Sequence, residues 1–280
     1  MHNKVCLITG ANAGIGFVTS RALAELGATV ILLCRDAGRG ENARRNITVE
    51  TGNDQVHFLL CDLSSQVSIR RAAESFLTQF GSLHVLINNA AMYTENRSLT
   101  VDDIEWQFAT NYLSCFLLTR LLLEVMKQSA PARIINLSTA NHHDVSLDLN
   151  DLQSERSYDP KPVHMRSKLA VILFTYELAR RLEGTGVTAN CLHPGVIATN
   201  LLGQVRRIPA DKRFTPEMGG DPLETGAKTP VYLASSPSVE NVSGKYFEDC
   251  RSETSSPETY DRSLARRLWE ISAGLTASAG

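Results

Sequence analysis

Thr9-Gly10-Ala11-Asn12-Ala13-Gly14-Ile15-Gly16 is the stretch of sequence that decides the fold. An apolar run from Val5 to Ile8 precedes it, and a helical pattern from Phe17 to Leu26 follows it. Strand, glycine turn and helix in this order place free N–H groups and the positive end of a helix dipole beside an anion. Glycines allow the sharp turn and let a pyrophosphate approach the backbone. Three glycines alone are a weak signal, and an empty strand-to-helix turn is the alternative.

Short apolar runs alternate with longer helical periods along the chain. The runs are rich in Val, Ile and Leu, as expected for parallel strands that are covered on both faces. We expect strands at 5–9, 29–34, 56–61, 85–88, 133–137, 187–192 and 245–247. We expect helices at 15–26, 38–51, 66–80, 101–128, 162–183 and 222–235.

This alternation predicts an α/β fold, a single-domain, doubly wound (Rossmann-like) parallel sheet of about seven strands with helices on both faces. The domain is expected to cover residues 1–280, including a substrate lid at about 200–221. The polar stretch 250–258 separates a final helix at roughly 259–273 from the body, within a C-terminal tail at 250–280.

The composition argues against several classes of protein. A net charge of −2 provides no basic field for nucleic acid. The six cysteines form no CxxC pair, which is typical of reduced thiols and not of a disulfide framework or a zinc site. No continuous apolar run reaches the roughly 18 residues that span a bilayer. We therefore expect a cytoplasmic protein with no membrane anchor, no metal and no nucleic-acid partner.

Arg35, directly after the second expected strand, bears on the choice of cofactor. In such a sheet the ligand binds at the carboxyl ends of the strands, where a basic residue meets the 2′-phosphate of NADP and an acidic one favours NAD. We expect NADP(H), with NAD(H) as the alternative. A surface Arg35 paired with Asp36 or Glu41 is the competing interpretation.

Polar residues also follow the third and fourth expected strands. Asp62 can accept a hydrogen bond from the adenine amino group, or it can cap the next helix. Asn88 and Asn89 can tie neighbouring loops together, and the small residues Ala90 and Ala91 then leave space for a ribose.

Together with several further motifs, these residues follow the order and spacing of the motifs of the short-chain dehydrogenase/reductase family. The resemblance covers nearly the whole chain. The further motifs are Asp62-Leu63, Asn111, Ser167-Lys168 and Pro194-Gly195. Within the family the chain is most similar to the retinol dehydrogenase and carbonyl reductase group, whose members are typically NADP(H)-linked. The resemblance implies cofactor contacts from Gly10, Asn12, Gly14, Ile15, Gly16, Arg35, Asp62, Leu63, Asn89, Ala90, Lys168, Pro194, Gly195, Val196 and Thr199.

The catalytic positions depart from the pattern of that family. The family uses a Tyr activated by a Lys four residues later, a Ser hydroxyl that binds the substrate oxygen, and an Asn that holds a water. Lys168 and Asn111 match, whereas His164 stands at the Tyr position and Thr139 at the Ser position. Imidazole is an acid–base group suited to neutral pH, but the Lys168 cation disfavours its protonated form.

Three interpretations of this site stay open. The chain is an oxidoreductase in which His164 or a water replaces the Tyr, with Thr139 holding the oxygen of a carbonyl or alcohol. Alternatively, it binds dinucleotide with little or no redox activity. In the third interpretation, His164 serves a different acid–base reaction.

The substrate and the assembly are predicted from apolar residues. The expected lid carries Leu201, Leu202, Val205 and Ile208, which suggests a lipophilic small-molecule substrate. The resemblance implies a homodimer through the helices at 101–128 and 162–183. A helix buried inside one chain would show the same apolar run.

Overall fold

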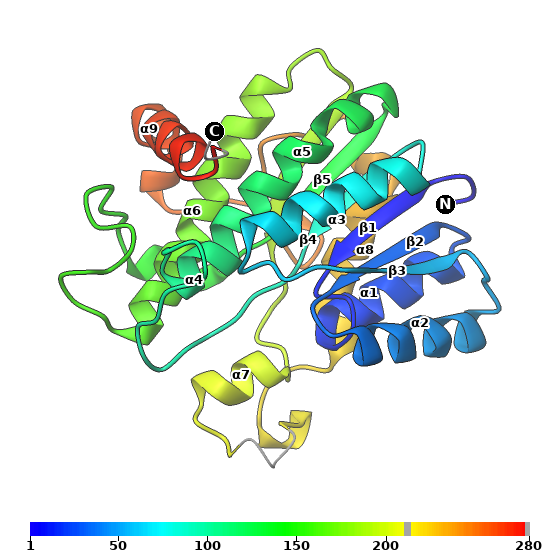
Figure 1. Ribbon diagram of the computed structural model, residues 1–280, viewed down its shortest axis with the longest axis horizontal. Coiled ribbons are helices and arrows are strands. Elements are labelled where there is room, and N and C mark those ends of the chain that lie inside the picture. The colour runs from blue at the N-terminus through cyan, green and yellow to red at the C-terminus, as the bar shows by residue number, and fades with distance from the viewer. Residues whose placement is uncertain (210–213, 278–280) are drawn as a thin grey trace.

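An eight-stranded sheet forms the centre of the protein in a computed structural model, which describes residues 1–209 and 214–277 (Figure 1). The strand order is β3-β2-β1-β4-β5-β6-β7-β8, and every neighbouring pair is parallel except β7 and β8. The strands are β1 (Val5–Thr9), β2 (Thr29–Cys34), β3 (Val56–Leu60), β4 (Val85–Asn88), β5 (Ala132–Leu137), β6 (Val187–His193), β7 (Tyr246–Glu248) and β8 (Arg251–Glu253).

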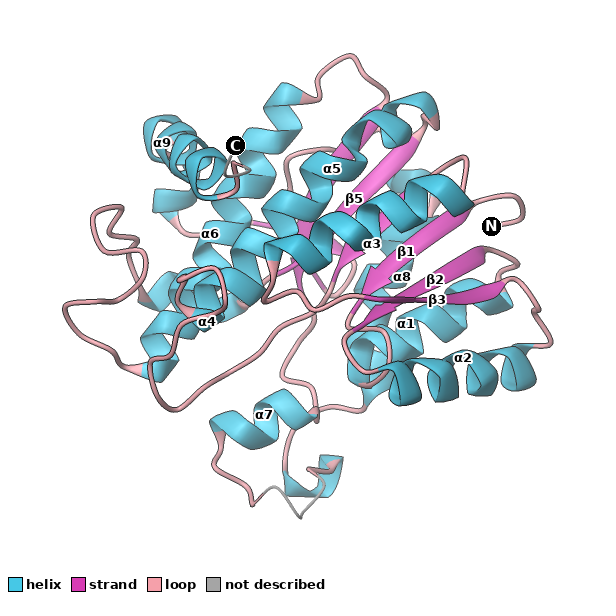
Figure 2. Cartoon of the chain, in the orientation of Figure 1, coloured by secondary structure: helices cyan, strands magenta, loops and turns pink. Residues whose placement is uncertain are grey.

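Helices cover both faces of this sheet, as Figure 2 shows. The helices of one face are α1 (Gly14–Glu25), α2 (Ala37–Thr51) and α8 (Leu223–Ser235). Those of the other face are α3 (Gln66–Gln79), α5 (Ser114–Gln128) and α6 (Pro160–Arg181), with α9 (Arg262–Leu275) packed on α6. Two short helices complete the set: α4 (Trp106–Phe108), which packs against α6 and leads through a π-helical turn into α5, and α7 (Asn200–Val205). The doubly wound Rossmann-like fold predicted from the sequence is confirmed.

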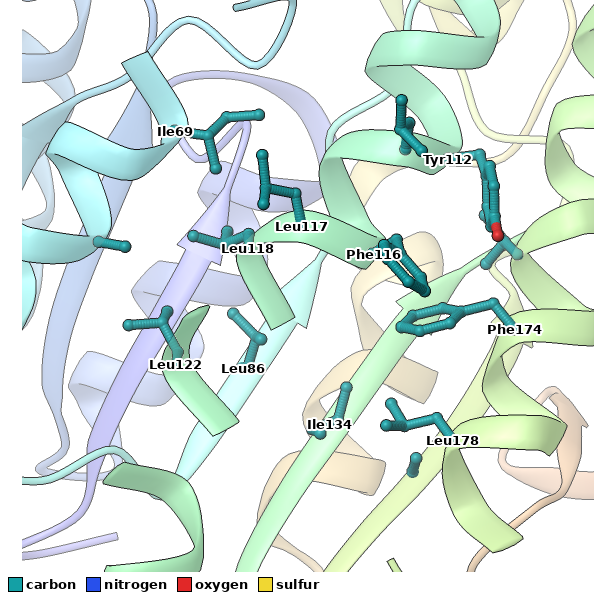
Figure 3. Packing of buried hydrophobic residues seen from close by; sticks show 14 of the residues in the cluster. Ile69, Leu86, Tyr112, Phe116, Leu117, Leu118, Leu122, Ile134, Phe174 and Leu178 are labelled. Carbon is teal, nitrogen blue, oxygen red and sulfur yellow. The ribbon is translucent and has the colours of Figure 1, made fainter. Parts of the chain in front are cut away.

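The larger hydrophobic core lies between the sheet and the α3–α5–α6 layer (Figure 3). Phe116 of α5 and Phe174 of α6 are buried with their ring centroids 5.5 Å apart. Trp269 of α9 packs on both rings, at 5.0 Å from Phe116 and 5.8 Å from Phe174. The C-terminal helix therefore covers the seam between α5 and α6.

The largest differences between the structure and the sequence-based expectations lie at two places. The polar stretch that was expected to be a separator contains β8, whose three residues are all exposed and pair antiparallel with β7. An edge strand of this kind is held by backbone hydrogen bonds and shows no apolar alternation. The helix expected from residue 101 begins only at Trp106, because Leu99 and Glu105 form an isolated antiparallel bridge before it.

The continuous helical stretch Trp106–Gln128 is long and apolar enough to cross a membrane by length and composition alone. Most of it, 72% of the window concerned, is buried inside the protein. A core helix of a globular domain meets the same test, so this stretch is weak support for a membrane span.

Candidate active site

Glycine is required at the turn between β1 and α1. Gly10 and Gly14 have φ angles of +64° and +58°, in the left-handed region that favours glycine. A Cβ on Gly16 would lie 2.5 Å from both the Asn89 amide nitrogen and the Gly10 carbonyl oxygen. The turn thus brings the start of α1 against the end of β4 with no room for side chains.

The first turn of α1 is open to an anion. Its N-cap is Ala13, which provides no side-chain hydrogen bond to the N–H groups of this turn, so none of them is capped in that way. Thr199 lies across the turn, since a Cβ on Gly14 would be 3.6 Å from its methyl group. Free N–H groups, the helix dipole and close backbone approach fit the pyrophosphate of a dinucleotide.

Two asparagines tie the central strands together at this edge. The backbone N–H groups of Asn89 and Ala90 both donate to Thr9 Oγ1 at 2.9 Å, and Asn89 Nδ2 donates to the Thr9 carbonyl at 2.8 Å. Asn88 Nδ2 donates to Asn136 Oδ1 of β5 at 2.8 Å. These bonds fix the ends of β1, β4 and β5 relative to one another.

Arg35 is exposed at the end of β2 and forms no ion pair with the residues that the structure describes. The two acids near it have other partners. Asp36 pairs with Arg39 at 3.3 Å, while Glu41 pairs with Arg44 at 2.7 Å and with Arg45 at 3.0 Å. The pairing of Arg35 with Asp36 or Glu41 that competed with a cofactor role is not formed.

Asp62 shapes the loop after β3. Its Oδ1 accepts hydrogen bonds from the backbone N–H of Ser64 at 3.0 Å and from the Ser64 hydroxyl at 2.7 Å. The N-cap of α3 is Ser65 and not Asp62. Leu63 is half-buried and packs against the core.

Asn111 lies in a π-helical turn, Ala109–Leu113, between α4 and α5. Such turns are rare and are frequent at functional sites. The Asn111 side chain is fully buried and pairs twice with the backbone of Met92: its Oδ1 accepts from the N–H at 2.7 Å, and its Nδ2 donates to the carbonyl at 3.0 Å. Its Nδ2 also donates to Ser167 Oγ at 3.1 Å.

Lys168 is buried on α6, where its Nζ donates to the Leu137 carbonyl at the end of β5 at 3.0 Å. No carboxylate lies within 4.0 Å of Nζ in the described parts of the chain. Burial therefore lowers the pKa of Lys168 to about 8, although the nearby Cys115 thiol opposes that shift.

His164 lies one turn before Lys168 and is partly exposed. Its Nδ1 is 3.2 Å from the Met92 carbonyl oxygen and 3.4 Å from Asn111 Nδ2. Burial, and then the Lys168 cation, lower the pKa of the imidazole to about 4, so the ring is neutral at neutral pH. The ring of Tyr93 stands edge-on to it at 6.1 Å.

Ser138 and Thr139 directly follow β5, beside the helix that carries His164. The Ser138 hydroxyl is buried and donates to the Lys168 carbonyl at 2.8 Å, so it is turned into the backbone of α6. Thr139 stays partly exposed, and among the residues that the structure describes its Oγ1 has one hydrogen bond, a long one of 3.4 Å accepted from the Asn141 N–H. Its hydroxyl hydrogen is therefore available to a ligand.

The turn after β6 completes the edge of the site. Val196 follows Pro194 and Gly195 and leaves 52% of its surface exposed, which is high for a valine. The backbone of Asp221 pairs with this turn: its N–H donates to the Val196 carbonyl at 2.7 Å, and its carbonyl accepts from the Ala198 N–H at 2.9 Å. The segment expected to be a lid carries α7 and half-buried Leu201 and Leu202, and residues 210–213 of that segment lie outside the described residues.

Other polar residues near the site have structural partners. The Tyr158 hydroxyl is 2.9 Å from Thr94 Oγ1 and accepts from Gln107 Nε2 at 2.8 Å. His142 is buried between the Thr139 carbonyl, at 2.6 Å, and the Ser256 N–H, at 3.0 Å. No group of three or more His, Cys, Asp and Glu that could hold a metal occurs in the part of the chain that the structure describes.

The structure thus gathers Asn111, His164 and Lys168, which the sequence picked out separately. The Met92 carbonyl, which contacts two of the site's side chains, was missed. It left no signal in the sequence, because any residue supplies the same backbone oxygen.

Known proteins share this arrangement of elements. The family model for short chain dehydrogenase matches residues 4–209. The chain belongs to the short-chain dehydrogenase family. Among curated members it is 45% identical to retinol dehydrogenase 14 of Mus musculus, over 97% of this chain and 85% of that protein. It is 44% identical to retinol dehydrogenase 12 of Homo sapiens, over 98% of this chain and 87% of that protein.

Solved structures show the same family fold. An uncharacterized protein from Mycobacterium paratuberculosis aligns with a TM-score of 0.78 and 33% identity, over 98% of this chain and 94% of that one. A short-chain dehydrogenase from Burkholderia cenocepacia, solved with NADP, aligns with a TM-score of 0.70 and 23% identity, over 88% and 96%. The second likeness is one of fold alone. The family and the homologues together identify an oxidoreductase related to the retinol dehydrogenases.

Proposed function

We propose that this protein is an NADP(H)-linked oxidoreductase that interconverts a lipophilic aldehyde or ketone and its alcohol, with His164 in place of the usual tyrosine. One observation carries the proposal: the Met92 carbonyl and Asn111 hold the His164 ring one turn from the buried Lys168. A neutral acid–base group is thereby fixed at the position from which the family moves its proton.

The residues that would hold the cofactor fit a phosphorylated dinucleotide. The open first turn of α1 suits the pyrophosphate, and Arg35, which forms no ion pair within residues 1–209 and 214–277, suits a 2′-phosphate. Lys168 would bind the ribose, while Val196 and Thr199 would border the nicotinamide half. When bound, the nicotinamide supplies a hydride donor or acceptor.

Apolar surface beside the site supports a lipophilic substrate. Val196 and Met218 leave 52% and 42% of their surfaces exposed, and Leu201 and Leu202 are only half-buried. The relatives with which the chain is 44–45% identical are named as dehydrogenases of retinol, a lipophilic alcohol.

Turnover should be followed in both directions, from NADPH absorbance, with matched aliphatic aldehydes and alcohols of increasing chain length. The wild-type protein is expected to turn over, and His164→Ala to lose on the order of a hundredfold in kcat, as for removal of an acid–base group. Tyr93→Phe is the matched control, because it alters a neighbouring ring and leaves the imidazole in place. Equal rates in wild type and His164→Ala would contradict the role of His164.

A second function is favoured by the low basicity of His164. With its pKa lowered to about 4, the ring is a weaker base than an ordinary histidine, which suits a protein that binds dinucleotide and scarcely reacts. In that case NADPH binds, wild type is inactive and His164→Tyr gains activity. Activity only in a non-redox reaction, lost in His164→Ala, would instead support a site converted to other acid–base chemistry.

A further inference from the structure

The hydrogen on the His164 ring can be placed from the groups around Nδ1. Two groups lie within reach of that nitrogen: the Met92 carbonyl oxygen, which only accepts, and Asn111 Nδ2, which only donates. If Nδ1 carries the hydrogen, it donates to Met92. If Nδ1 is bare, it must accept from Asn111. Which of the two holds depends on where the Asn111 amide hydrogens go.

The Asn111 amide has no hydrogen left for the ring. Its orientation is fixed, because its Oδ1 accepts from the Met92 N–H at 2.7 Å. Its two amide hydrogens have nearer acceptors than the ring, the Met92 carbonyl at 3.0 Å and Ser167 Oγ at 3.1 Å. Ser167 is free to accept, since its own hydroxyl donates to the His164 carbonyl at 2.6 Å.

His164 Nδ1 therefore bears the hydrogen and donates it to the Met92 carbonyl oxygen. The second lone pair of that oxygen accepts the hydrogen bond from Asn111 Nδ2. In a neutral imidazole the other nitrogen, Nε2, then carries a lone pair and no hydrogen. Nε2 makes no hydrogen bond within residues 1–209 and 214–277, and the His164 side chain is partly exposed. Nε2 is thus an acceptor open to a ligand.

We propose that the Met92 carbonyl and Asn111 hold His164 as the Nδ1–H tautomer, so that the site binds the hydroxyl form of its substrate in preference to the carbonyl form. The inference rests on the proposed function and names which partner of the redox pair is recognised. An alcohol oxygen donates one hydrogen bond and accepts others. It can donate to His164 Nε2 and accept from the Thr139 hydroxyl, whereas a carbonyl oxygen faces the His164 lone pair with nothing to donate.

Asn111 is a positioning residue in this scheme. It fixes the Met92 backbone through two hydrogen bonds. Its two amide hydrogens go to the Met92 carbonyl and to Ser167, so neither is left to stabilise an Nδ1 atom without a hydrogen. A tyrosine at position 164 would provide a hydroxyl that both donates and accepts. The substitution of histidine therefore changes which form of the substrate is bound, because Nε2 accepts a hydrogen bond and has no hydrogen to donate.

The tautomer is tested directly by long-range ¹H–¹⁵N NMR on the full chain labelled at its seven histidines, with His164 assigned from the spectrum of His164→Tyr. We expect the pattern of a ring protonated at Nδ1 at neutral pH. An Nε2-protonated pattern would overturn the proposal. This readout needs neither cofactor nor turnover.

Ligand preference is tested on the protein without cofactor, so that no reaction occurs. A primary alcohol, its methyl ether and the aldehyde of the same carbon chain are titrated by calorimetry. We expect the alcohol to bind roughly threefold to tenfold more tightly than the other two, as for one net hydrogen bond, and the difference to vanish in His164→Phe.

Equal affinity for the three ligands in wild type, or no binding of any, would overturn the preference. If the alcohol still binds more tightly in His164→Phe, a group other than His164 causes the preference, which would overturn the proposal. If the tautomer and the preference hold while the protein shows no turnover with any cofactor, the proposed redox function fails and this inference stands.

Discussion

Lys168 and His164 occupy successive turns of α6, and within the described chain no carboxylate lies at ion-pair distance from either. With no such partner, burial leaves the pKa of each group lower in the folded protein than in water. The direction of these pKa shifts determines how each group changes the free energy of unfolding with pH. A group whose pKa is lower in the folded state makes the unfolded state bind more protons between the two pKa values, so stability rises with pH across that interval.

Lys168→Met is expected to stabilise the protein at neutral pH. Below about pH 8 Lys168 is charged in both states, and the cost of burying that charge, on the order of 3 kcal/mol for this shift, is complete. Between pH 8 and 10.5 the cost disappears, because the folded state releases its proton first. Urea unfolding at about pH 7 and about pH 9.5 should show a gain that shrinks with pH.

Lys161→Met is the matched control, since Lys161 is exposed on the same helix. We expect its effect on the free energy of unfolding to be small and the same at both pH values. If Lys168→Met instead destabilised the protein equally at both, the hydrogen bond to the Leu137 carbonyl would outweigh the burial of the charge.

Arg35→Ser is expected to reduce the preference for NADP(H) over NAD(H) by about tenfold or more, since a charge-assisted hydrogen bond is worth about 1.5–3 kcal/mol. Fluorescence titration of both reduced cofactors measures this ratio. Arg39→Ser serves as the comparison, because Arg39 already pairs with Asp36. A larger loss of preference in Arg39→Ser would show that the wrong arginine has been assigned to the 2′-phosphate.

At the scale of elements, the buried strands were predictable and the edge of the sheet was not. β1, β2 and β4 begin and end where the apolar runs do, because strands covered on both faces must be apolar throughout. β8 consists of Arg251, Ser252 and Glu253, all exposed, and its place depends on backbone pairing with β7. No pattern of side chains records such a pairing.

The candidate site divides in a similar way. Asn111, His164 and Lys168 could be found through the resemblance to the short-chain dehydrogenase/reductase family, and the four-residue spacing of His164 and Lys168 places them on successive turns of one helix. The orientation of the His164 ring could not, since it depends on a backbone oxygen 72 positions earlier in the chain. The π-helical turn that carries Asn111 has no distinct sequence pattern either.

Helix α9 is expected to contribute strongly to stability through one side chain. Trp269 packs on Phe116 and Phe174, and the Arg181 guanidinium lies 4.2 Å from the centre of its ring. Trp269→Ala should lower the free energy of unfolding by about 3 kcal/mol, at the low end for a large aromatic because the ring is only partly buried. Arg266→Ala, exposed on the same helix, should change it by less than about 0.5 kcal/mol in the same urea titration.

At the scale of the whole molecule, α9 bears on assembly. The sequence favoured a homodimer through the helices now described as α5 and α6, with burial inside one chain as the alternative. Leu117, Leu118 and Leu122 are buried within the chain, and α9 covers the seam between the two helices. The structure agrees with the alternative for these residues.

We therefore predict that this face does not join two copies of the chain. Light scattering should give the mass of one chain, 30.7 kDa. If it gives twice that mass, Glu124→Cys on the exposed side of α5 tests the face, because a symmetric helix pairing would bring two such thiols together. Rapid disulfide formation between chains would refute the prediction, and its absence would place any dimer on another surface.

The short antiparallel strand β8 has a consequence for solubility. An open sheet edge offers unpaired backbone groups to other molecules, and proteins protect such edges with short strands and charged side chains. At the edge of this sheet beyond β7, the strand β8 is only three residues long and carries the charged side chains of Arg251 and Glu253. Replacing the three residues of β8 with Val-Thr-Val should leave the fold intact and promote fibrillar aggregation on storage, measurable by thioflavin fluorescence. The segment omitted from the expected strands would then be the one that keeps the sheet from growing beyond a single molecule.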